Sequence, residues 1–225
     1  MTIEEIVADD TLFAETFCRV VDMSSSSNMG VLVPFRVDAM PMQRHFVDNV
    51  LHGGRTRAIE LKARRVGGTT LFTVLGMVKA MRTPNFNVGL LAQNEPEALR
   101  FGRMWKQLYT DMVEKVILPD GNIFVAKPPV GIFSDHMVEF PTLGSSLNVG
   151  TAGSTKLWRG ANFGMIIGTE VSKWDVGRPV GTAEETWAMA EGALSPGGLG
   201  VLESTAYGGG GFFYNTYIGG KSGEN

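Results

Sequence analysis

Apolar and polar residues follow two different patterns along this chain. Apolar positions recur at helical spacing in residues 3–21, 42–51, 71–81, 94–116 and 182–194. Short apolar runs typical of buried strands occupy 58–61, 87–92, 163–167 and 200–203; residues 31–36 are extended, and 137–140 and 147–149 are further candidates. Buried strands that alternate with helices predict an α/β domain, whose mostly parallel central sheet is covered by helices on both faces.

The segments between these elements are rich in serine or glycine. Residues 22–30 contain four consecutive serines, and the glycine run 208–211 precedes an aromatic segment at 212–217. Residues 219–225 are polar and glycine-rich, which predicts a linker or a frayed end. The pattern therefore predicts one domain over residues 1–218, followed by a short tail.

Polar residues gather where three of the predicted strands end. These clusters are Lys62–Thr70, Thr169–Glu170 and Ser204–Thr205. In open parallel sheets, ligands bind outside the carboxyl ends of the strands. The three clusters are therefore the first candidates for a functional site.

Composition and charge narrow the possible functions. The formal net charge of −3 argues against a generally basic nucleic-acid binder, so any DNA contact must come from local patches. The single cysteine, Cys18, cannot form an internal disulfide, which fits a reducing cytosolic setting and a small buried side chain. No apolar run approaches the length of a membrane span, and the three histidines lack ligand spacing, so we expect no membrane partner and no histidine metal site.

The first cluster has the form of a phosphate-binding loop between a strand and a helix. Gly67 and Gly68 allow a tight turn and the close approach of backbone N–H groups to phosphates. Thr69 or Thr70 would open the helix and offer a hydroxyl to Mg²⁺. These features predict a P-loop-type site for a nucleoside triphosphate.

The loop departs from the standard pattern G-x-x-x-x-G-K-[ST] in two ways. The first glycine is absent, and Gly68 stands where the lysine is expected. Basic residues lie just upstream instead, at Lys62, Arg64 and Arg65, from where a cation reaches the same phosphates from the other side of the loop. The alternative is a strand–turn–helix whose basic residues are merely solvated.

The second cluster ends the hydrophobic strand at 163–167 with Thr169 and Glu170. Such a strand has the shape of a Walker B motif in which Thr169 replaces the usual aspartate. ATP hydrolysis needs a group that activates or orients water beside the γ-phosphate, and Glu170 is the natural base. Thr169 would hold Mg²⁺ only through water. The alternative is an ordinary acidic residue in a loop after a strand.

These motifs, in this order, resemble the large terminase subunits of tailed phages. The loop 62–70 is similar to a variant in which the lysine stands at the start of the loop. Pro34–Arg36 with Pro41–Gln43 resembles the family's adenine-recognition segment, and Glu203–Ala206, followed by glycines and aromatic residues, resembles its coupling motif. The resemblance spans roughly residues 33–217. It implies an ASCE/RecA-like P-loop NTPase fold and ATP with Mg²⁺ as cofactors.

The resemblance also implies roles for individual residues. Gln43 would contact adenine, within an N-terminal helical and adenine-binding segment of the ATPase domain. Lys62 would bind phosphate, and Arg64 or Arg65 would sense the γ-phosphate. Ser204 and Thr205 would sense hydrolysis and pass it on to DNA movement. Thr69 would ligate Mg²⁺ and Glu170 would act as the base.

The implied activity is ATP hydrolysis that drives double-stranded viral DNA into a procapsid in the host cytoplasm. The implied partners are the DNA, the portal protein and the small terminase subunit, within a homo-oligomeric ring on the capsid; the isolated chain could be monomeric. Arg159 stands where a neighbouring subunit's arginine is plausible, although a solvated loop arginine is equally compatible. No second carboxylate cluster is visible, so nuclease activity is not expected. The alternatives are a helicase-type translocase and a non-hydrolysing adaptor.

Overall fold

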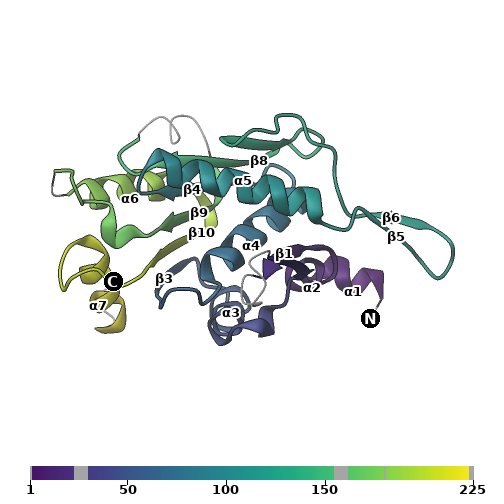
Figure 1. Ribbon diagram of the computed structural model, residues 1–225, viewed down its shortest axis with the longest axis horizontal. Coiled ribbons are helices and arrows are strands. Elements are labelled where there is room, and N and C mark those ends of the chain that lie inside the picture. The colour runs from purple at the N-terminus through teal and green to yellow at the C-terminus, as the bar shows by residue number, and fades with distance from the viewer. Residues whose placement is uncertain (1, 23–29, 155–161, 180, 223–225) are drawn as a thin grey trace.

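The computed structural model describes residues 2–22, 30–154, 162–179 and 181–222 (Figure 1). Its centre is a six-stranded sheet with the strand order β3-β10-β9-β4-β8-β7. These strands are β3 (Arg57–Leu61), β10 (Leu194–Ser204), β9 (Phe163–Thr169), β4 (Asn87–Ala92), β8 (Ser145–Thr151) and β7 (Met137–Phe140). All neighbouring pairs are parallel except β7 with β8, so the mostly parallel sheet is confirmed.

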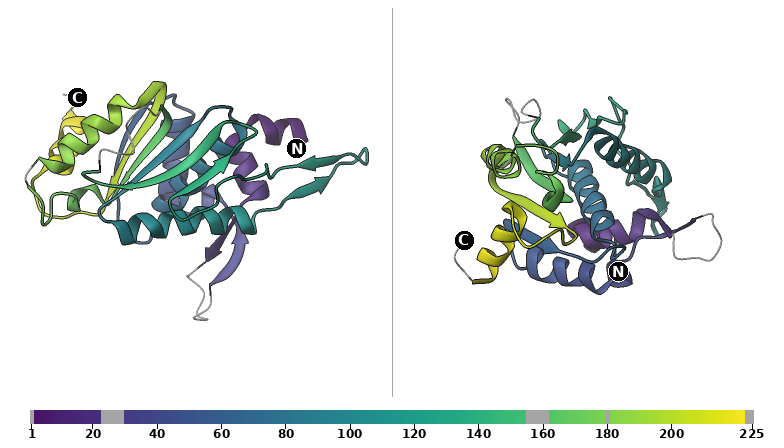
Figure 2. Two further views of the ribbon diagram at one scale, coloured as in Figure 1. Left: turned by 90° about the horizontal axis from the view of Figure 1, so that it is seen from above. Right: turned by 60° about the vertical axis from the view of Figure 1, so that its left-hand side comes forward.

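Helices cover both faces of this sheet, as the continuous apolar runs of its inner strands predict. On one face, α4 (Gly68–Arg82) and α5 (Glu95–Asp111) pack against Leu90 and Val201. On the other face, α6 (Thr182–Gly192) and α7 (Phe212–Ser222) enclose Ile166 and Leu202 (Figure 2). Alternate residues of a strand thus enter two separate cores, one on each face of the sheet. The polar residues lie where the strands end.

The N-terminal part is divided into more elements than its helical spacing predicts. The single helix expected over residues 3–21 is two helices, α1 (Ile3–Ala8) and α2 (Asp10–Phe17), because Asp9 ends the first and caps the second. Strand β1 (Arg19–Asp22) then pairs with β2 (Val31–Pro34). Cys18, between α2 and β1, is fully buried, and burial raises the pKa of its thiol to about 12.

The segment that leads to the central sheet is helical, as predicted. A short 3-10 turn, η1 (Val37–Ala39), precedes α3 (Pro41–Phe46) and the π-helical turn η2 (Val47–Leu51). Phe46 and Val47 of this segment are fully buried in the same core as Leu71 of α4. The segment therefore lies against the helix that follows the phosphate-loop candidate.

The predicted extension of α5 to residue 116 is wrong. Asn94 caps the start of α5 as expected, accepting a hydrogen bond of 3.1 Å from the Glu97 N–H, but the helix ends at Asp111. The following residues form β5 (Lys115–Ile117), which pairs with β6 (Ile123–Val125) in a hairpin that projects from the body (Figures 1 and 2). Strand pairing thus overrides the helical spacing at the end of this segment.

The C-terminal elements also differ in extent from the prediction. Helix α6 ends at Gly192, and β10 begins at Leu194, with an irregularity before Leu199. The aromatic segment forms α7, which continues to Ser222 into the range predicted as a linker. Across the described ranges, no helix combines the length and apolar character needed to cross a bilayer.

Candidate active site

The three polar clusters meet at one edge of the sheet. Strand β10 lies between β3 and β9, so its carboxyl end stands between the loop after β3 and Glu170 after β9. A cavity of about 600 Å³ opens there. Its lining contains five basic residues and only two carboxylates. The lining residues are Lys62, Arg64, Arg65, Thr69, Ala92, Gln93, Glu97, Arg100, Thr169, Glu170, Lys173 and Thr205. The excess of positive charge suits an anionic ligand.

The loop after β3 ends in a left-handed turn that starts α4. Gly67 has φ +74, where glycine carries no steric penalty, and α4 begins at the next residue. Arg65 also adopts a positive φ of 62, and its side chain is exposed at the cavity. The amino end of the 15-residue helix α4 therefore faces the cavity with its free N–H groups and positive dipole end.

The side chain of Lys62 passes close to Gly68, the residue that stands where the standard loop has its lysine. A Cβ built on Gly68 would be 3.1 Å from Cδ of Lys62 and 2.5 Å from Cε of Met42. The methyl group of Met42 and the stem of Lys62 therefore fill the space in which a side chain at position 68 would begin. This arrangement supports the interpretation that the phosphate-binding cation has moved from position 68 to position 62.

The ammonium of Lys62 is held by two carboxylates. Its Nζ lies 2.8 Å from Oε2 of Glu203 and 3.7 Å from Oε1 of Glu170. Burial lowers the pKa of Lys62, and the charge and hydrogen bond of Glu170 oppose this shift only in part. A triphosphate in the cavity would compete with these carboxylates for the same cation.

Glu203, which is buried behind the cavity, is one of the residues that sequence reasoning missed. Its side chain is 0% exposed, and its Oε1 accepts a hydrogen bond of 3.2 Å from the hydroxyl of Thr69. The signal was present in the sequence, since Glu203 directly precedes Ser204 at the end of an apolar strand. A charged residue at a position that should be buried is a candidate for function.

Glu170 adopts a left-handed backbone conformation, with φ 51, that turns the chain sharply after β9. Its Oε2 lies 2.8 Å from Nζ of Lys173 and accepts a hydrogen bond of 3.0 Å from the Thr205 hydroxyl. Burial alone would raise the pKa of Glu170, but the hydrogen bonds from Lys173 and Thr205 and the charges of Lys173 and Lys62 lower it overall. The carboxylate is thus ionised at neutral pH, as a group that orients or activates water must be.

The predicted coupling residues lie beside this carboxylate. Thr205 contacts Glu170 directly, whereas Ser204 is fully buried, and its Oγ lies 2.6 Å from Oγ of Ser172. Ser172 also donates a hydrogen bond of 2.9 Å to the backbone carbonyl of Thr205. Ser172, which the sequence analysis also did not single out, therefore ties the end of β10 to the turn after Glu170.

Gln43 is close to the phosphate loop, and only 3% of it is exposed. Its Nε2 donates a hydrogen bond of 2.8 Å to the carbonyl of Gly67, and its buried Oε1 has no hydrogen-bond partner among the residues that the structure describes. A Cβ on Gly67 would be only 2.4 Å from Nε2. Gln43 thus supports the loop in this structure, and its unpaired oxygen is free to accept a hydrogen bond.

The remaining predicted residues are not all brought together. Arg64 and Thr169 line the cavity with the residues above. Thr70 lines a different pocket, beside β1 and α5, so Thr69 is the better candidate for a hydroxyl near Mg²⁺. Arg159 lies outside the described residues.

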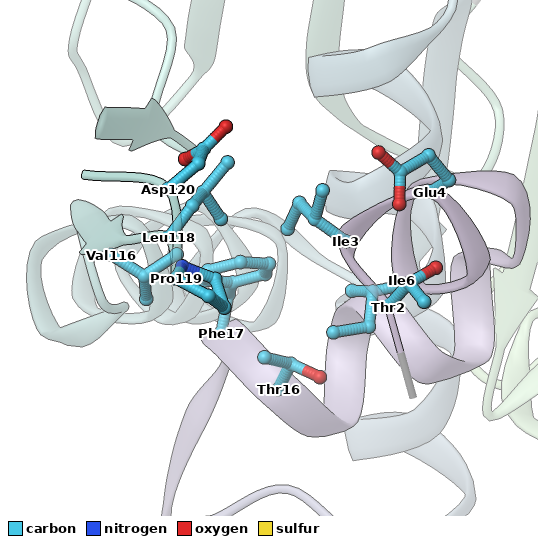
Figure 3. A pocket seen from close by; sticks show the side chains of 10 residues that line it. All are labelled: Thr2, Ile3, Glu4, Ile6, Thr16, Phe17, Val116, Leu118, Pro119 and Asp120. Atoms are coloured by element: carbon cyan, nitrogen blue, oxygen red, sulfur yellow. The ribbon is translucent and has the colours of Figure 1, made fainter. Parts of the chain in front are cut away.

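A second cavity, of about 500 Å³, lies between α1, α2 and the β5–β6 hairpin (Figure 3). Its walls are largely apolar, with Ile3, Phe17 and Leu118 among the lining side chains. The described residues that line it include the acids Glu4 and Asp120 but no lysine or arginine. This cavity is therefore unsuited to a phosphate ligand.

The donor groups of the sheet-edge cavity fit Mg²⁺ bound together with a nucleotide. Mg²⁺ is usually held by one or two carboxylates, substrate phosphates and water. Thr69 presents a hydroxyl oxygen at the cavity wall, and the buried carboxylate of Glu203, which accepts a hydrogen bond from that hydroxyl, lies behind it. The described part of the chain contains no group of three or more His, Cys, Asp or Glu side chains that would hold a metal without the nucleotide.

The sheet order, the loop before α4 and the charged edge together define an α/β P-loop NTPase fold. Among solved structures, the large terminase of bacteriophage HK97 matches 100% of this chain, with a TM-score of 0.64 and 19% sequence identity. The chain spans 42% of that HK97 chain. Two structures of the Thermus phage P74-26 large terminase ATPase domain, one of them a mutant, match 72% of this chain with TM-scores of 0.48 and 0.46 and identities of 14% and 15%.

The fold assignment rests on the HK97 match, which confirms the resemblance to phage large terminases at the level of the fold. No protein-family model and no curated protein sequence matches this chain.

Proposed function

We propose that this chain is an ATPase that binds ATP with Mg²⁺ and hydrolyses its terminal phosphate. The observation that carries the proposal is the meeting of Lys62, Thr69 and Glu170 around one positively lined cavity at the amino end of α4. These are the groups that phosphoryl transfer requires: a cation for the phosphates, a hydroxyl for the metal, and a carboxylate beside the water. Mg²⁺ would neutralise charge that develops on the phosphate oxygens.

Each side chain has a defined part in this proposal. Lys62, Arg64 and the backbone N–H groups after Gly67 bind the phosphates, and Arg65 stands at the open side of the cavity. Glu170 orients and activates the attacking water. Its lowered pKa keeps it ionised but makes it a weak base, which suits orientation more than full proton removal.

The work proposed for this ATPase is the movement of double-stranded DNA into a viral procapsid, in the host cytoplasm. The fold match to the HK97 large terminase supports this role. The proposed partners are the DNA, a portal protein and a small terminase subunit. In this proposal Thr205 reports the state of the phosphate to the segment after β10, and its hydrogen bond to Glu170 supports that role.

Steady-state ATP hydrolysis tests the proposal. Wild-type protein is expected to release phosphate in the presence of Mg²⁺, and Glu170→Gln and Lys62→Ala are each expected to lower the rate by about a hundredfold or more. The matched controls are Glu185→Gln, in the first turn of α6, and Lys115→Ala, in the β5–β6 hairpin, which are expected to keep the wild-type rate. Wild-type activity that survives Glu170→Gln would refute the assignment.

A mixing experiment tests whether subunits share a site. Arg159→Ala and Glu170→Gln proteins are each expected to be inactive. If the arginine acts in a neighbour's site, an equimolar mixture on assembled procapsids recovers part of the activity. A mixture as inactive as its components would count against a trans-acting Arg159.

A further inference from the structure

Glu203 stands in the sheet one strand away from the position at which a Walker B aspartate is expected. The strand register places it directly beside Thr169 of β9 and Glu60 of β3. Paired residues of neighbouring parallel strands project to the same face of a sheet, so all three side chains lie on the α4 side. The buried carboxylate of Glu203 therefore lies next to Thr169, which stands where a Walker B strand has its aspartate.

The contacts of Glu203 connect the two groups proposed to meet the nucleotide and its metal. Oε1 accepts a hydrogen bond from the Thr69 hydroxyl at 3.2 Å, and Oε2 lies 2.8 Å from Nζ of Lys62. Within the described ranges, Oε2 accepts no further hydrogen bond, although Glu203 is 0% exposed. The second oxygen is thus satisfied by its ion pair with Lys62, a cation that the phosphates would attract.

Stability alone does not account for a carboxylate in this place. A buried ion pair is often no more stabilising than apolar residues of similar size. Glu60, its neighbour on β3, makes neither of these contacts in the described structure. When Lys62 turns to a phosphate, Glu203 loses its cation and requires another positive charge close by. Mg²⁺ next to Thr69 is a cation of the right kind.

We propose that Glu203 is the positioning carboxylate of this site and takes the place of the acidic residue missing at Thr169. Without nucleotide it holds Lys62 and Thr69. With nucleotide it orients the Thr69 hydroxyl and offsets the charge of Mg²⁺ beside it. This inference rests on the proposed function, because it assigns Glu203 a part in binding ATP with Mg²⁺.

Calorimetry with a non-hydrolysable ATP analogue, in Mg²⁺ and in EDTA, tests the inference without relying on turnover. Wild-type protein is expected to bind the analogue more tightly in Mg²⁺. Glu203→Gln is expected to reduce that enhancement by roughly ten- to a hundredfold, the range seen when groups behind metal ligands are removed. Its binding in EDTA is expected to stay equal or become tighter, because loss of the negative charge frees Lys62.

Two further variants separate this role from a structural one. Thr169→Asp in the Glu203→Gln background returns a carboxylate to the same face and is expected to restore most of the Mg²⁺ enhancement. The matched control Glu60→Gln removes the neighbouring carboxylate and is expected to leave the enhancement unchanged. If Glu203→Gln does not fold, Thr169→Asp alone remains informative. If Glu203 already supplies the carboxylate, Thr169→Asp should leave the Mg²⁺ enhancement within about threefold of wild type. A rise of about tenfold or more would mean that no residue supplied it, and would overturn the inference.

The outcomes bear on the two proposals differently. An enhancement that Glu203→Gln retains overturns this inference and leaves the ATPase proposal intact. Equal weakening in Mg²⁺ and in EDTA, without rescue by Thr169→Asp, shows a purely structural residue and also overturns it. Wild-type protein that binds no analogue in either condition refutes the proposed function, and the inference falls with it.

Discussion

The substitution Lys62→Met tests the electrostatics of the site through protein stability. The Lys62 side chain is 8% exposed and Glu203 is 0% exposed, with 2.8 Å between their charged atoms. Removal of one partner from a buried pair typically costs about 3–5 kcal/mol, because it leaves an uncompensated buried charge. Glu203 can escape that state by taking up a proton, which costs a carboxyl group of ordinary pKa about 3.7 kcal/mol at pH 7. We therefore expect a loss of about 3–4 kcal/mol in the free energy of unfolding.

The same reasoning fixes how the loss depends on pH. In the variant, the folded protein binds a proton that the unfolded chain does not, so its stability falls relative to wild type as pH rises. Between pH 7 and pH 5.5 the loss is expected to shrink by about 2 kcal/mol. Urea unfolding at the two pH values, with linear extrapolation to water, measures both quantities.

Two controls make this prediction specific. Lys79→Met removes an ion pair of 2.5 Å with Asp10, but Lys79 is 40% exposed, so we expect a loss of only about 0–1 kcal/mol. The double variant Lys62→Met/Glu203→Gln leaves no buried charge and is expected to recover all but about 1–2 kcal/mol. A loss below about 1 kcal/mol for Lys62→Met, or one that does not change with pH, would refute the reasoning.

Three further predictions follow from single contacts. Lys173→Met removes the hydrogen bond that most lowers the pKa of Glu170, so the acid limb of the ATPase pH–rate profile should move to higher pH; an unmoved limb would mean that Glu170 does not set it. Gly67→Ala should cost about 1–2 kcal/mol for its positive φ, plus the cost of the clash with Gln43. Gly54→Ala, at φ +64 and with no described atom within 4 Å of the added Cβ, should show only the backbone cost; thermal unfolding measures both losses. Thr205→Val should also raise the pKa of Glu170 and shift the acid limb in the same direction, and an opposite shift would contradict the assigned contact.

The sequence by itself determined the features that depend on residues close to one another along the chain. The bounds predicted for β4 and β7 agree with the structure, because a continuous or alternating apolar run between polar turns fixes a strand locally. Asn94 as a cap and Gly67 as the turn before α4 also follow from the local chemistry of those residues. The order strand, loop and helix was therefore enough to locate the loop between β3 and α4 that we propose binds phosphate.

Only the tertiary structure decided how distant segments meet. Pro119, Asp120 and Gly121 mark a turn in the sequence, but the apolar spacing before them does not show that α5 already ends at Asp111; the pairing of β5 with β6 decides that boundary. The strand order likewise places β10 between β3 and β9, and this brings Glu203 to Lys62 and Thr69, more than 130 residues away. Sequence periodicity shows which residues are buried, but the partner of a buried charge depends on strand order. For that reason the sequence marks Glu203 as a charge at the end of a buried strand, whereas only the strand order shows that it pairs with Lys62.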